Sequence, residues 1–346
     1  MNSILSEAKL KKLPRPIRKE AVAKAKIMHF GPGAFFRSFV ASLINDVNQK
    51  DDEKWGIIAV SLHSEDTFNK LESQDLVFNA LSMSSKKKEI QKVSSISNFF
   101  VAKKDGQSVV EALSDEQIEI VSLTITEKGY HYNSDKKELD LSNQNIIDDL
   151  ENPENPETAV GFLVAGLRDR YLSGKAPFTV LSCDNLPNNG AVVKKIILDF
   201  AQKIDTDLAN WISKEVCFPS SMIDRITPAT KERDIINFAE EYGVYDPALV
   251  VHEEFFQWVI EDKFSSERPN FELAGIQMVS NVELHEKMKL RCLNGTHSAL
   301  AYLGYLAGFN TIAECVSDDS MVNYIKYLWE EEIIPTLGTP EGENLS

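Results

Sequence analysis

The sequence predicts an α/β fold, in which a doubly wound parallel sheet precedes a mostly α-helical second domain. Up to about residue 205, short and nearly continuous apolar segments alternate with helical patterns, and from about residue 285 the pattern is wholly helical. This alternation implies right-handed βαβ units, whose parallel strands are covered by helices on both faces. At 346 residues the chain exceeds the size of a typical single core, so two domains are expected.

The apolar segments give the order of the elements. Strands are predicted at KIMHF (26–30), WGIIAVSL (55–62), IEIVSLTIT (118–126) and FTVLSC (178–183). Helices are predicted up to about Val47 after the first strand, and over 159–172 and 191–204.

Composition excludes several classes of partner. The chain has 37 Lys and Arg against 53 Asp and Glu, a net charge of −16, so phosphate backbones and anionic membrane surfaces should be repelled. No apolar run approaches the roughly 20 residues that span a bilayer, and the N-terminus lacks the apolar core of a signal peptide. The four cysteines show no metal-ligand spacing, so we expect a cytoplasmic protein with free thiols and no metal.

The first strand runs into a glycine turn, HFGPGAFFRSF, that opens a helix. This is the context of a Rossmann-type dinucleotide-binding turn, in which Gly31 and Gly33 would let the backbone approach a pyrophosphate at the helix N-terminus. Phe36 replaces the third glycine of that motif, so a turn that needs glycine for backbone reasons alone stays an alternative. After the second strand, VSLHSED offers Glu65 and Asp66 late, which leaves NAD and NADP both open.

A second polar group follows the strand FTVLSC. Asp184 and Asn185 stand at its carboxyl end, where open α/β sheets bind ligands, and Asn185 is well placed for a substrate oxygen. Asp and Asn are also common turn formers, so a plain turn is the competing interpretation.

The segment MKLRCLNGTHSALAYLGYLAG (288–308) carries three polar groups within apolar surroundings. If 288–306 is a helix, Asn294 lies about 140° and His297 about 80° around the axis from Lys289, so the three share one face. A desolvated lysine can act as the base for the hydroxyl proton when a nicotinamide cofactor oxidises an alcohol, while Asn185 and Asn294 supply donors to the alkoxide. A solvated lysine, an Asn-Gly turn and a core histidine remain the alternatives.

Together, GPGAFFR, SLTITEKGY, SCDNLPNNG, FPSSMIDRITPAT, QWVIED and the 288–308 segment resemble the mannitol dehydrogenase family, the polyol-specific long-chain dehydrogenases that include mannitol 2-dehydrogenase and fructuronate reductase (mannonate oxidoreductase). The likeness covers roughly residues 24 to 340. It implies that Lys289 is the general acid/base, that Asn185 and Asn294 form the oxyanion site, and that His297 orients the substrate. It further implies that Asp224 lines the substrate site and that Glu286 exchanges protons with solvent.

The resemblance also implies the cofactor and the domains. NAD or NADP is expected, with NAD preferred and no zinc, and the cofactor contacts are assigned to Phe30, Gly31, Gly33, Phe35, Arg37, Asp66, Thr126 and Glu127. The expected domains are an N-terminal arm (1–23), an NAD(P)-binding domain (24–280, core about 24–205) and the start of a helical substrate-binding domain (281–346). The oligomeric state is left open, although a monomer agrees with the family.

Departures from the family pattern define the alternatives. Phe36 and Phe39 stand where relatives usually have histidine, Phe256 replaces an arginine, and the family's further C-terminal helices are expected to be missing. The resemblance implies an oxidoreductase that interconverts a C2 ketone and a secondary alcohol of a hexuronate or hexitol, with the fructuronate/mannonate type favoured over fructose/mannitol. The competing hypothesis is an inactive dinucleotide-binding homologue or fragment.

Overall fold

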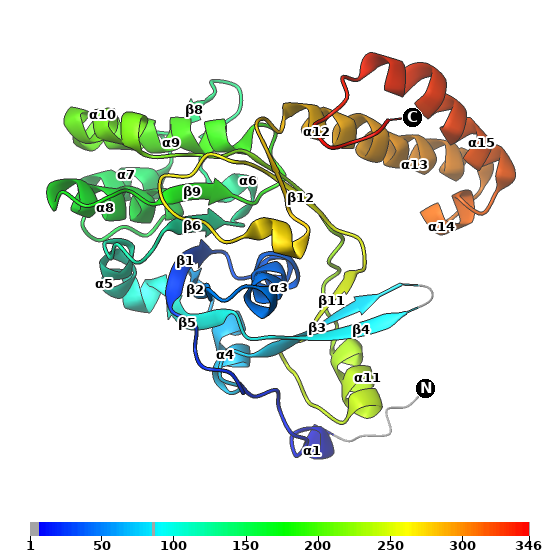
Figure 1. Cartoon of the computed structure of the whole chain (residues 1–346), viewed down its shortest axis with the longest axis horizontal. Coiled ribbons are helices and arrows are strands. Elements are labelled where there is room, and N and C mark those ends of the chain that lie inside the picture. The colour runs from blue at the N-terminus through cyan, green and yellow to red at the C-terminus, as the bar shows by residue number, and fades with distance from the viewer. Residues whose placement is uncertain (1–6, 85–86, 346) are drawn as a thin grey trace.

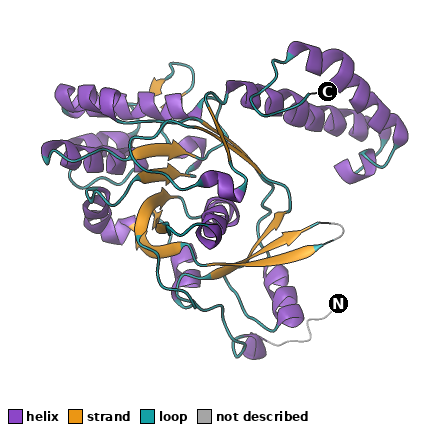
Figure 2. Ribbon diagram, in the orientation of Figure 1, coloured by secondary structure: helices purple, strands orange, loops and turns teal. Residues whose placement is uncertain are grey.

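The computed structural model describes residues 7–84 and 87–345, and its centre is a parallel sheet with the strand order β5-β2-β1-β6-β9 (Figures 1 and 2). These strands are β1 (Ala25–Phe30), β2 (Gly56–Ser61), β5 (Ile96–Val101), β6 (Ile120–Leu123) and β9 (Thr179–Ser182). The winding reverses between β1 and β6, which places a ligand crevice beyond the carboxyl ends of these two strands. The predicted doubly wound sheet is confirmed.

Helices cover both faces of this sheet. One face is packed by α5 (Ala102–Leu113), α7 (Gln144–Glu151), α8 (Ala159–Leu172), α9 (Asn189–Ile204) and α10 (Thr206–Glu215). The other face is packed by α4 (Asp66–Glu72) and by one continuous helix made of α2 (Ala34–Phe36), a π-helical segment η1 (Arg37–Ala41) and α3 (Ser42–Lys50). Helix α8 has the predicted bounds, and the hydroxyl of Thr158 caps it by accepting from the Gly161 amide.

Two smaller sheets, which the sequence analysis does not identify, extend the first domain. One has the order β11-β3-β4, from β3 (Phe78–Met83), β4 (Lys88–Val93) and β11 (Val250–Glu253). The other has the order β10-β12-β13, from β10 (Ser221–Asp224), β12 (Gln257–Glu261) and β13 (Gln277–Val279). Short elements complete this part: α1 (Glu7–Leu10), α6 (Thr126–Gly129), the hairpin β7 (Tyr132–Asn133) with β8 (Glu138–Leu139), α11 (Glu232–Tyr242) and η2 (Phe271–Ala274).

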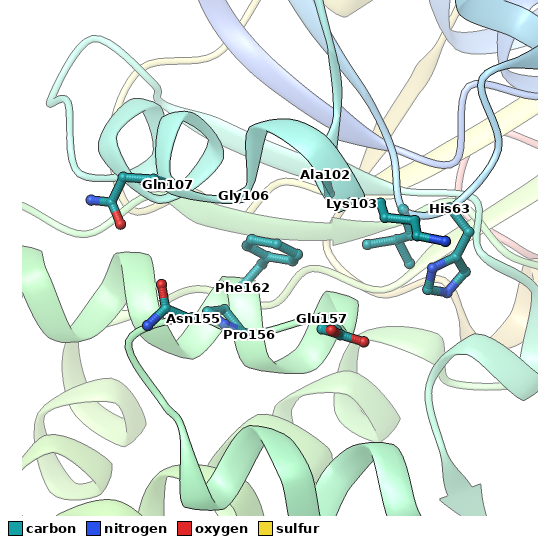
Figure 3. Close-up of a pocket in the computed structure, with 10 residues that line it drawn as sticks. His63, Ala102, Lys103, Gly106, Gln107, Asn155, Pro156, Glu157 and Phe162 are labelled. Atoms are coloured by element: carbon teal, nitrogen blue, oxygen red, sulfur yellow. The ribbon is translucent and has the colours of Figure 1, made fainter.

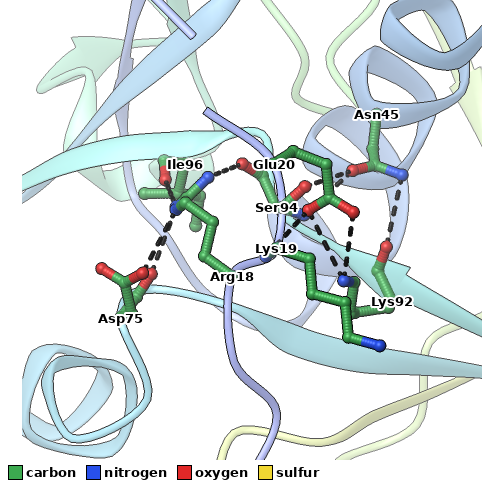
Figure 4. A network of polar contacts seen from close by, with 8 residues as sticks. All are labelled: Arg18, Lys19, Glu20, Asn45, Asp75, Lys92, Ser94 and Ile96. Carbon is green, nitrogen blue, oxygen red and sulfur yellow. Dashed lines mark hydrogen bonds and ion pairs between the residues drawn. The ribbon is translucent and has the colours of Figure 1, made fainter. Parts of the chain in front are cut away.

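The N-terminal arm is fastened to the sheet domain at Arg18 (Figure 4). Its guanidinium donates to the carbonyl oxygens of Ser94 and Ile96, at 2.5 and 2.6 Å, and Glu20 pairs with Lys92 at 3.2 Å. The described part of the arm therefore lies along the edge of the sheet, whereas residues 1–6 are outside the described range.

The C-terminal part is helical, as predicted, and stands apart from the sheet in Figure 1. It contains α12 (Glu283–Met288), a π-helical turn η3 (Lys289–Asn294), α13 (Gly295–Ala307), α14 (Ile312–Cys315), α15 (Asp319–Tyr327), η4 (Leu328–Ile333) and η5 (Ile334–Thr336). The chain then returns to the first domain, where the Glu343 carboxylate accepts from the side-chain amides of Gln257 and Gln277. None of the described helices combines the length and the apolar character that a membrane crossing requires.

Candidate active site

The glycine turn lies at the carboxyl end of β1 and opens the long helix over 34–50. Gly31 has φ +93°, and a Cβ on it would lie 2.1 Å from the carbonyl oxygen of Thr124. A Cβ on Gly33 would meet nothing closer than the Gly31 carbonyl oxygen, at 4.0 Å. The backbone thus packs tightly behind the turn and leaves open space in front of it, beside the free N–H groups of the helix N-terminus, which suits a pyrophosphate.

The place of the missing third glycine is taken by a buried aromatic stack. Phe36 is fully buried and stacks on the His29 ring, with centroids 3.9 Å apart. The His29 ring is hydrogen-bonded to Ser122 and Thr124, and the Thr124 hydroxyl donates to the Gly31 carbonyl oxygen. Burial lowers the pKa of His29 to about 3, so the ring stays neutral and serves to fix the turn.

Two cavities lie beside the segments that follow β2, β5 and β6, near the carboxyl ends of these strands. Their volumes are about 440 and 360 Å³, and both are bordered by Leu62, His63 and Glu157 (the larger is shown in Figure 3). Thr126 lines the smaller cavity and Lys103 lines the larger. His63, Lys103 and Glu157 received no role from the sequence, because they come from two loops and the start of α5, which only the fold brings together.

The other predicted cofactor residues lie at varying distance from these cavities. Asp66 is exposed at the start of α4, outside both cavities, and Glu127 is exposed on α6. Phe35 is half-buried and stacks on Phe39. The side chain of Phe30 lies in the core, so only its backbone can border the turn.

Arg37 corrects the expectation of a cofactor contact through its side chain. The fourth residue after Gly33 faces inward, and its guanidinium donates to the Ala248 carbonyl oxygen beneath the ring of Phe78. Burial lowers the pKa of this guanidinium to about 10. Arg37 therefore joins the long helix to the β11-β3-β4 sheet.

A further cavity, of about 340 Å³, brings together residues from β9, β10 and the helical part. Its lining includes four of the predicted catalytic or substrate residues: Asn185, Glu286, Lys289 and Asn294. The remainder of the lining is formed by Asp184, Leu186, Pro187, Ser221, Met222, Ile223, Glu283, Lys287 and Leu290.

The amino group of Lys289 is held in this cavity by groups at the ends of β9 and β10. Its amino group donates to the side-chain oxygen of Asn185 at 3.1 Å and to the carbonyl oxygen of Ile223 at 2.5 Å, and it lies 3.9 Å from the Asp224 carboxylate. The side chain is only 11% exposed. Burial lowers the pKa of Lys289, while the charges of Asp224 and Glu286 act in the opposite direction. An amine with a lowered pKa can exchange protons nearer neutral pH than an exposed lysine can.

The contact with Lys289 orients the amide of Asn185. Because the amide oxygen accepts from the ammonium, its NH₂ group is left to donate elsewhere in the cavity. Glu286 lines the same cavity, where its carboxylate accepts from the Asn188 amide at 3.0 Å. Burial raises the pKa of Glu286, which brings its proton exchange closer to neutral pH.

The helix that carries Lys289 is not a regular α-helix, and this alters the predicted geometry. Residues Lys289–Asn294 form a π-helical turn, which ends with the Gly295 amide donating to the Leu290 carbonyl oxygen. In such a turn residues five apart lie above one another, so Asn294 is brought under Lys289. His297 instead is exposed and does not line the cavity. The structure therefore unites Lys289 with Asn294 but not with His297.

Asp184 received no role from the sequence, yet its carboxylate connects the end of β9 to the loop after β6. Its carboxylate accepts from the backbone amides of Ile125 and Thr126, both at 3.0 Å, and from the Tyr130 hydroxyl at 2.7 Å. Burial raises the pKa of Asp184 despite these donors. The strand-end position was visible in the sequence, but the partners on the β6 loop were not.

Among the described residues, no group of three or more His, Cys, Asp or Glu is arranged to hold a metal ion. The four cysteines, all within the described range, are free thiols. The groups around Lys289 are an amine, amides and carboxylates, which suits proton transfer and hydrogen bonding to a polar small molecule.

Comparisons with known proteins agree with this geometry. The model of the mannitol dehydrogenase Rossmann domain matches residues 25–273, and that of the mannitol dehydrogenase C-terminal domain matches 281–346. NAD or NADP, the expected cofactor, therefore fits a domain of this type. The match over 281–346 shows that the family's C-terminal domain is represented in this chain, over the residues where the start of a helical substrate-binding domain was expected.

The relatives described below are all named as dehydrogenases or oxidoreductases, and their names give different substrates. The D-mannonate oxidoreductase of Escherichia coli (strain K12) is 40% identical over 336 residues, which cover 96% of this chain and 69% of the relative. A D-sorbitol dehydrogenase structure in substrate-free form has a TM-score of 0.91 at 36% identity and covers 97% of this chain and 71% of that one. Pseudomonas fluorescens mannitol 2-dehydrogenase, in a ternary complex with NAD and D-mannitol, has a TM-score of 0.85 at 36% identity and covers 99% and 71%.

The chain is therefore matched almost throughout, while it spans between 66% and 70% of the length of the first curated relatives. The matches include both the sheet domain with the glycine turn and the helical part with Lys289. The chain belongs to the mannitol dehydrogenase family.

Proposed function

We propose that the chain is an NAD(P)-dependent oxidoreductase that interconverts a C2 ketone and a secondary alcohol of a hexuronate or hexitol. The fructuronate/mannonate pair is the preferred substrate and fructose/mannitol the other candidate. The observation that carries the proposal is the amino group of Lys289, which is withdrawn from solvent in a cavity with Asn185 and Asn294. The names of the D-mannonate oxidoreductase and mannitol 2-dehydrogenase relatives support the substrate class.

Lys289 is the proposed acid and base. In oxidation the neutral amine takes the proton of the substrate hydroxyl, and in reduction the ammonium returns a proton to the alkoxide oxygen. The nicotinamide cofactor, when bound, accepts or supplies the hydride. Burial lowers the pKa of Lys289 and so favours the neutral amine. The nearby charges of Asp224 and Glu286 favour the ammonium, so both protonation states can take part in the reaction.

The two asparagines are the proposed donors to the developing alkoxide. The NH₂ group of Asn185 is directed away from Lys289, because the amide oxygen is already taken by the ammonium. Asn294 lines the same cavity from the helical side. Fixed donors in such a site stabilise negative charge without reorganisation at the moment of reaction.

The charges of the cavity bear on the choice between a sugar acid and a polyol. Among the described residues that line it, the cations are Lys287 and Lys289, and Lys287 is already paired with Glu283 at 2.6 Å. Arg225, which directly follows β10 and is a candidate partner for a substrate carboxylate, does not line this cavity; its guanidinium packs on Phe39 and Phe256. The carboxylate of a hexuronate would therefore have to bind Lys287 in place of Glu283, whereas a hexitol needs only neutral hydrogen-bond partners.

The experiment is a panel of fructuronate, tagaturonate, mannonate, fructose and mannitol, assayed with NAD(H) and NADP(H) by the absorbance of the reduced cofactor. Turnover of at least one C2 pair is expected, and Lys289→Ala should lower kcat by about 10²–10⁴-fold while NADH binding is retained. NADH binding without turnover of any substrate would instead identify an inactive dinucleotide-binding homologue. Turnover by Lys289→Ala at the wild-type rate would rule out the assigned base.

A further inference from the structure

The turn after β6 and the turn after β9 are joined by one carboxylate, that of Asp184. The β6 turn carries Ile125, Thr126 and Tyr130, and Thr126 lines a cavity on the proposed cofactor side. The β9 turn carries Asn185, which touches Lys289. The two turns are about 60 residues apart in sequence, as the separation of 59 between Asp184 and Ile125 shows.

The bonds that Asp184 accepts use both of its carboxylate oxygens. One oxygen accepts from the Thr126 amide, and the other from the Ile125 amide and the Tyr130 hydroxyl. The hydroxyl also lies 2.8 Å from the Ser182 hydroxyl, and the Tyr130 ring is buried. These bonds hold the carboxylate in one rotamer, because its loss would deprive the buried Tyr130 hydroxyl and the partly buried Ile125 amide of this acceptor.

The β6 turn needs such a partner. Thr126 has φ +64°, a left-handed conformation that costs free energy for a β-branched residue. The bond from its amide to Asp184 helps to compensate that cost. Without the carboxylate the turn would be free to relax.

The main chain of Asp184 is fixed as well. Its carbonyl oxygen accepts from the Leu186 amide at 2.8 Å and from the side-chain amide of Asn189 at 3.0 Å. Asn189 is fully buried, and its side chain also bonds the backbone of Ser221, at the start of β10. The residue that precedes Asn185 is therefore held at both its main chain and its side chain.

We propose that Asp184 is a positioning residue, which locks the cofactor-side turn after β6 to the turn that presents Asn185 to Lys289. This inference rests on the proposed function. Asp184 does not act on Lys289 through its own charge, because the charges that bear on Lys289 are those of Asp224 on β10 and Glu286 on α12. Its effect passes through the position of Asn185, whose oxygen accepts from the lysine.

The experiment compares Asp184→Asn with Asp246→Asn in the full chain. Asp246 is the control, since its carboxylate also accepts from two backbone amides, those of Asn79 and Ala248; it is buried, lies between β3 and β11 and does not line the Lys289 cavity. Three quantities are measured: thermal stability, kcat with the best substrate of the panel, and the pH midpoint for acylation of Lys289, followed by competitive labelling and mass spectrometry of its peptide.

Both variants should lose thermal stability, because each leaves two backbone amide donors with a poorer acceptor. Only Asp184→Asn should lower kcat, by roughly 10–100-fold for a misplaced acid/base pair, and only it should move the labelling midpoint of Lys289 up toward that of a solvated lysine. Equal behaviour of the two variants in kcat and in the Lys289 midpoint would overturn the proposal.

Two further arms keep the proposal testable. If Asp184→Asn does not fold, Tyr130→Phe removes one of the three bonds and should lower kcat by about threefold and raise the Lys289 midpoint slightly; an unchanged midpoint would then overturn the proposal. If the wild-type chain turns over no substrate, the proposed function fails, and the labelling midpoints of Lys289 still decide the role of Asp184.

Discussion

The candidate site has two halves that are held in different ways. The sheet half, Asn185 and Asp224, stands at the ends of β9 and β10, and the buried Asn189 ties the end of β9 to the start of β10. The helix half, Glu286, Lys289 and Asn294, lies on α12 and on a π-helical turn that has no buried residue. The sheet half is therefore held by the buried strands themselves. The helix half is held against it by the contacts of Lys289 with Asn185 and Ile223, and by the contact of Glu286 with Asn188.

The largest expected effect separates the two asparagines. Asn185→Ala removes an alkoxide donor and a partner of Lys289, so kcat should fall by about 10²–10³-fold. Asn294→Ala removes a donor only, and its loss should be about tenfold smaller. Steady-state kinetics of both variants measure the difference, with NADH binding as the control. An equal loss of kcat would show that Asn185 and Asn294 contribute equally to catalysis.

Substitutions of the two glycines in the turn after β1 should affect different properties, one the stability of the chain and the other its cofactor binding. Gly31→Ala should destabilise the chain by at least about 1–3 kcal/mol, because its φ of +93° is costly for alanine and its Cβ would collide with the Thr124 carbonyl oxygen. Gly33→Ala has ordinary dihedrals and free space, so it should leave the melting temperature unchanged and weaken NADH binding instead. Calorimetry and fluorescence titration test the pair, and a stable Gly31→Ala variant would contradict the packing behind the turn.

The pH profile tests the electrostatic link between the halves. Oxidation requires neutral Lys289, so its rate should rise with pH through the lowered pKa of this lysine, while reduction should decline over the same range. Asp224 raises the pKa of Lys289, so Asp224→Asn should shift both profiles to lower pH.

Glu283→Gln is the control for this shift, because Glu283 lines the same cavity but is paired with Lys287 and does not bear on Lys289. Profiles of kcat against pH should therefore coincide for Glu283→Gln and the wild type. A shift in the opposite direction for Asp224→Asn would show that another group titrates.

The smallest effect is expected at the end of the helix half. His297 is exposed and outside the cavity, so His297→Ala should change kcat/KM by no more than about twofold, as for other surface substitutions. Kinetics on the best substrate measure this. A loss as large as that of Asn294→Ala would restore the predicted substrate contact of His297.

The fold was predictable wherever one pattern dominated. The buried strands are nearly continuous apolar runs, and α8 is apolar on almost every side, so its bounds follow from the sequence. The strand β5 was missed, because Ser97 and Asn98 interrupt its apolar run at the edge of the sheet. Of the two smaller sheets, the β10-β12-β13 sheet was missed because its strands are short. In the other, β4 (KEIQKV) is mostly polar, and Val250 of β11 pairs with Ala80 of β3 across a long separation that no local pattern reveals.

The site was predictable in its residue types but not in its geometry. Lys289 and Asn294 were placed on one face by assuming a regular helix, whereas a π-helical turn brings them together and leaves His297 aside. Arg37 was assigned to the cofactor from its position in the motif, yet its side chain is drawn inward by the Ala248 carbonyl oxygen. Asp184 could not be ranked above other turn formers, because its donors come from a different loop.

The π-helical turn at Lys289–Asn294 determines how this part of the chain would respond to insertions and deletions. Such a turn accommodates one residue more than an α-helical turn over the same rise. Loss of a single residue between Leu290 and Leu293 would therefore be absorbed by conversion to an unbroken α-helix, with Asn294 and the residues after it still in register with Lys289. The same loss within the regular helix α13 would instead rotate the register of all that follows by about 100°.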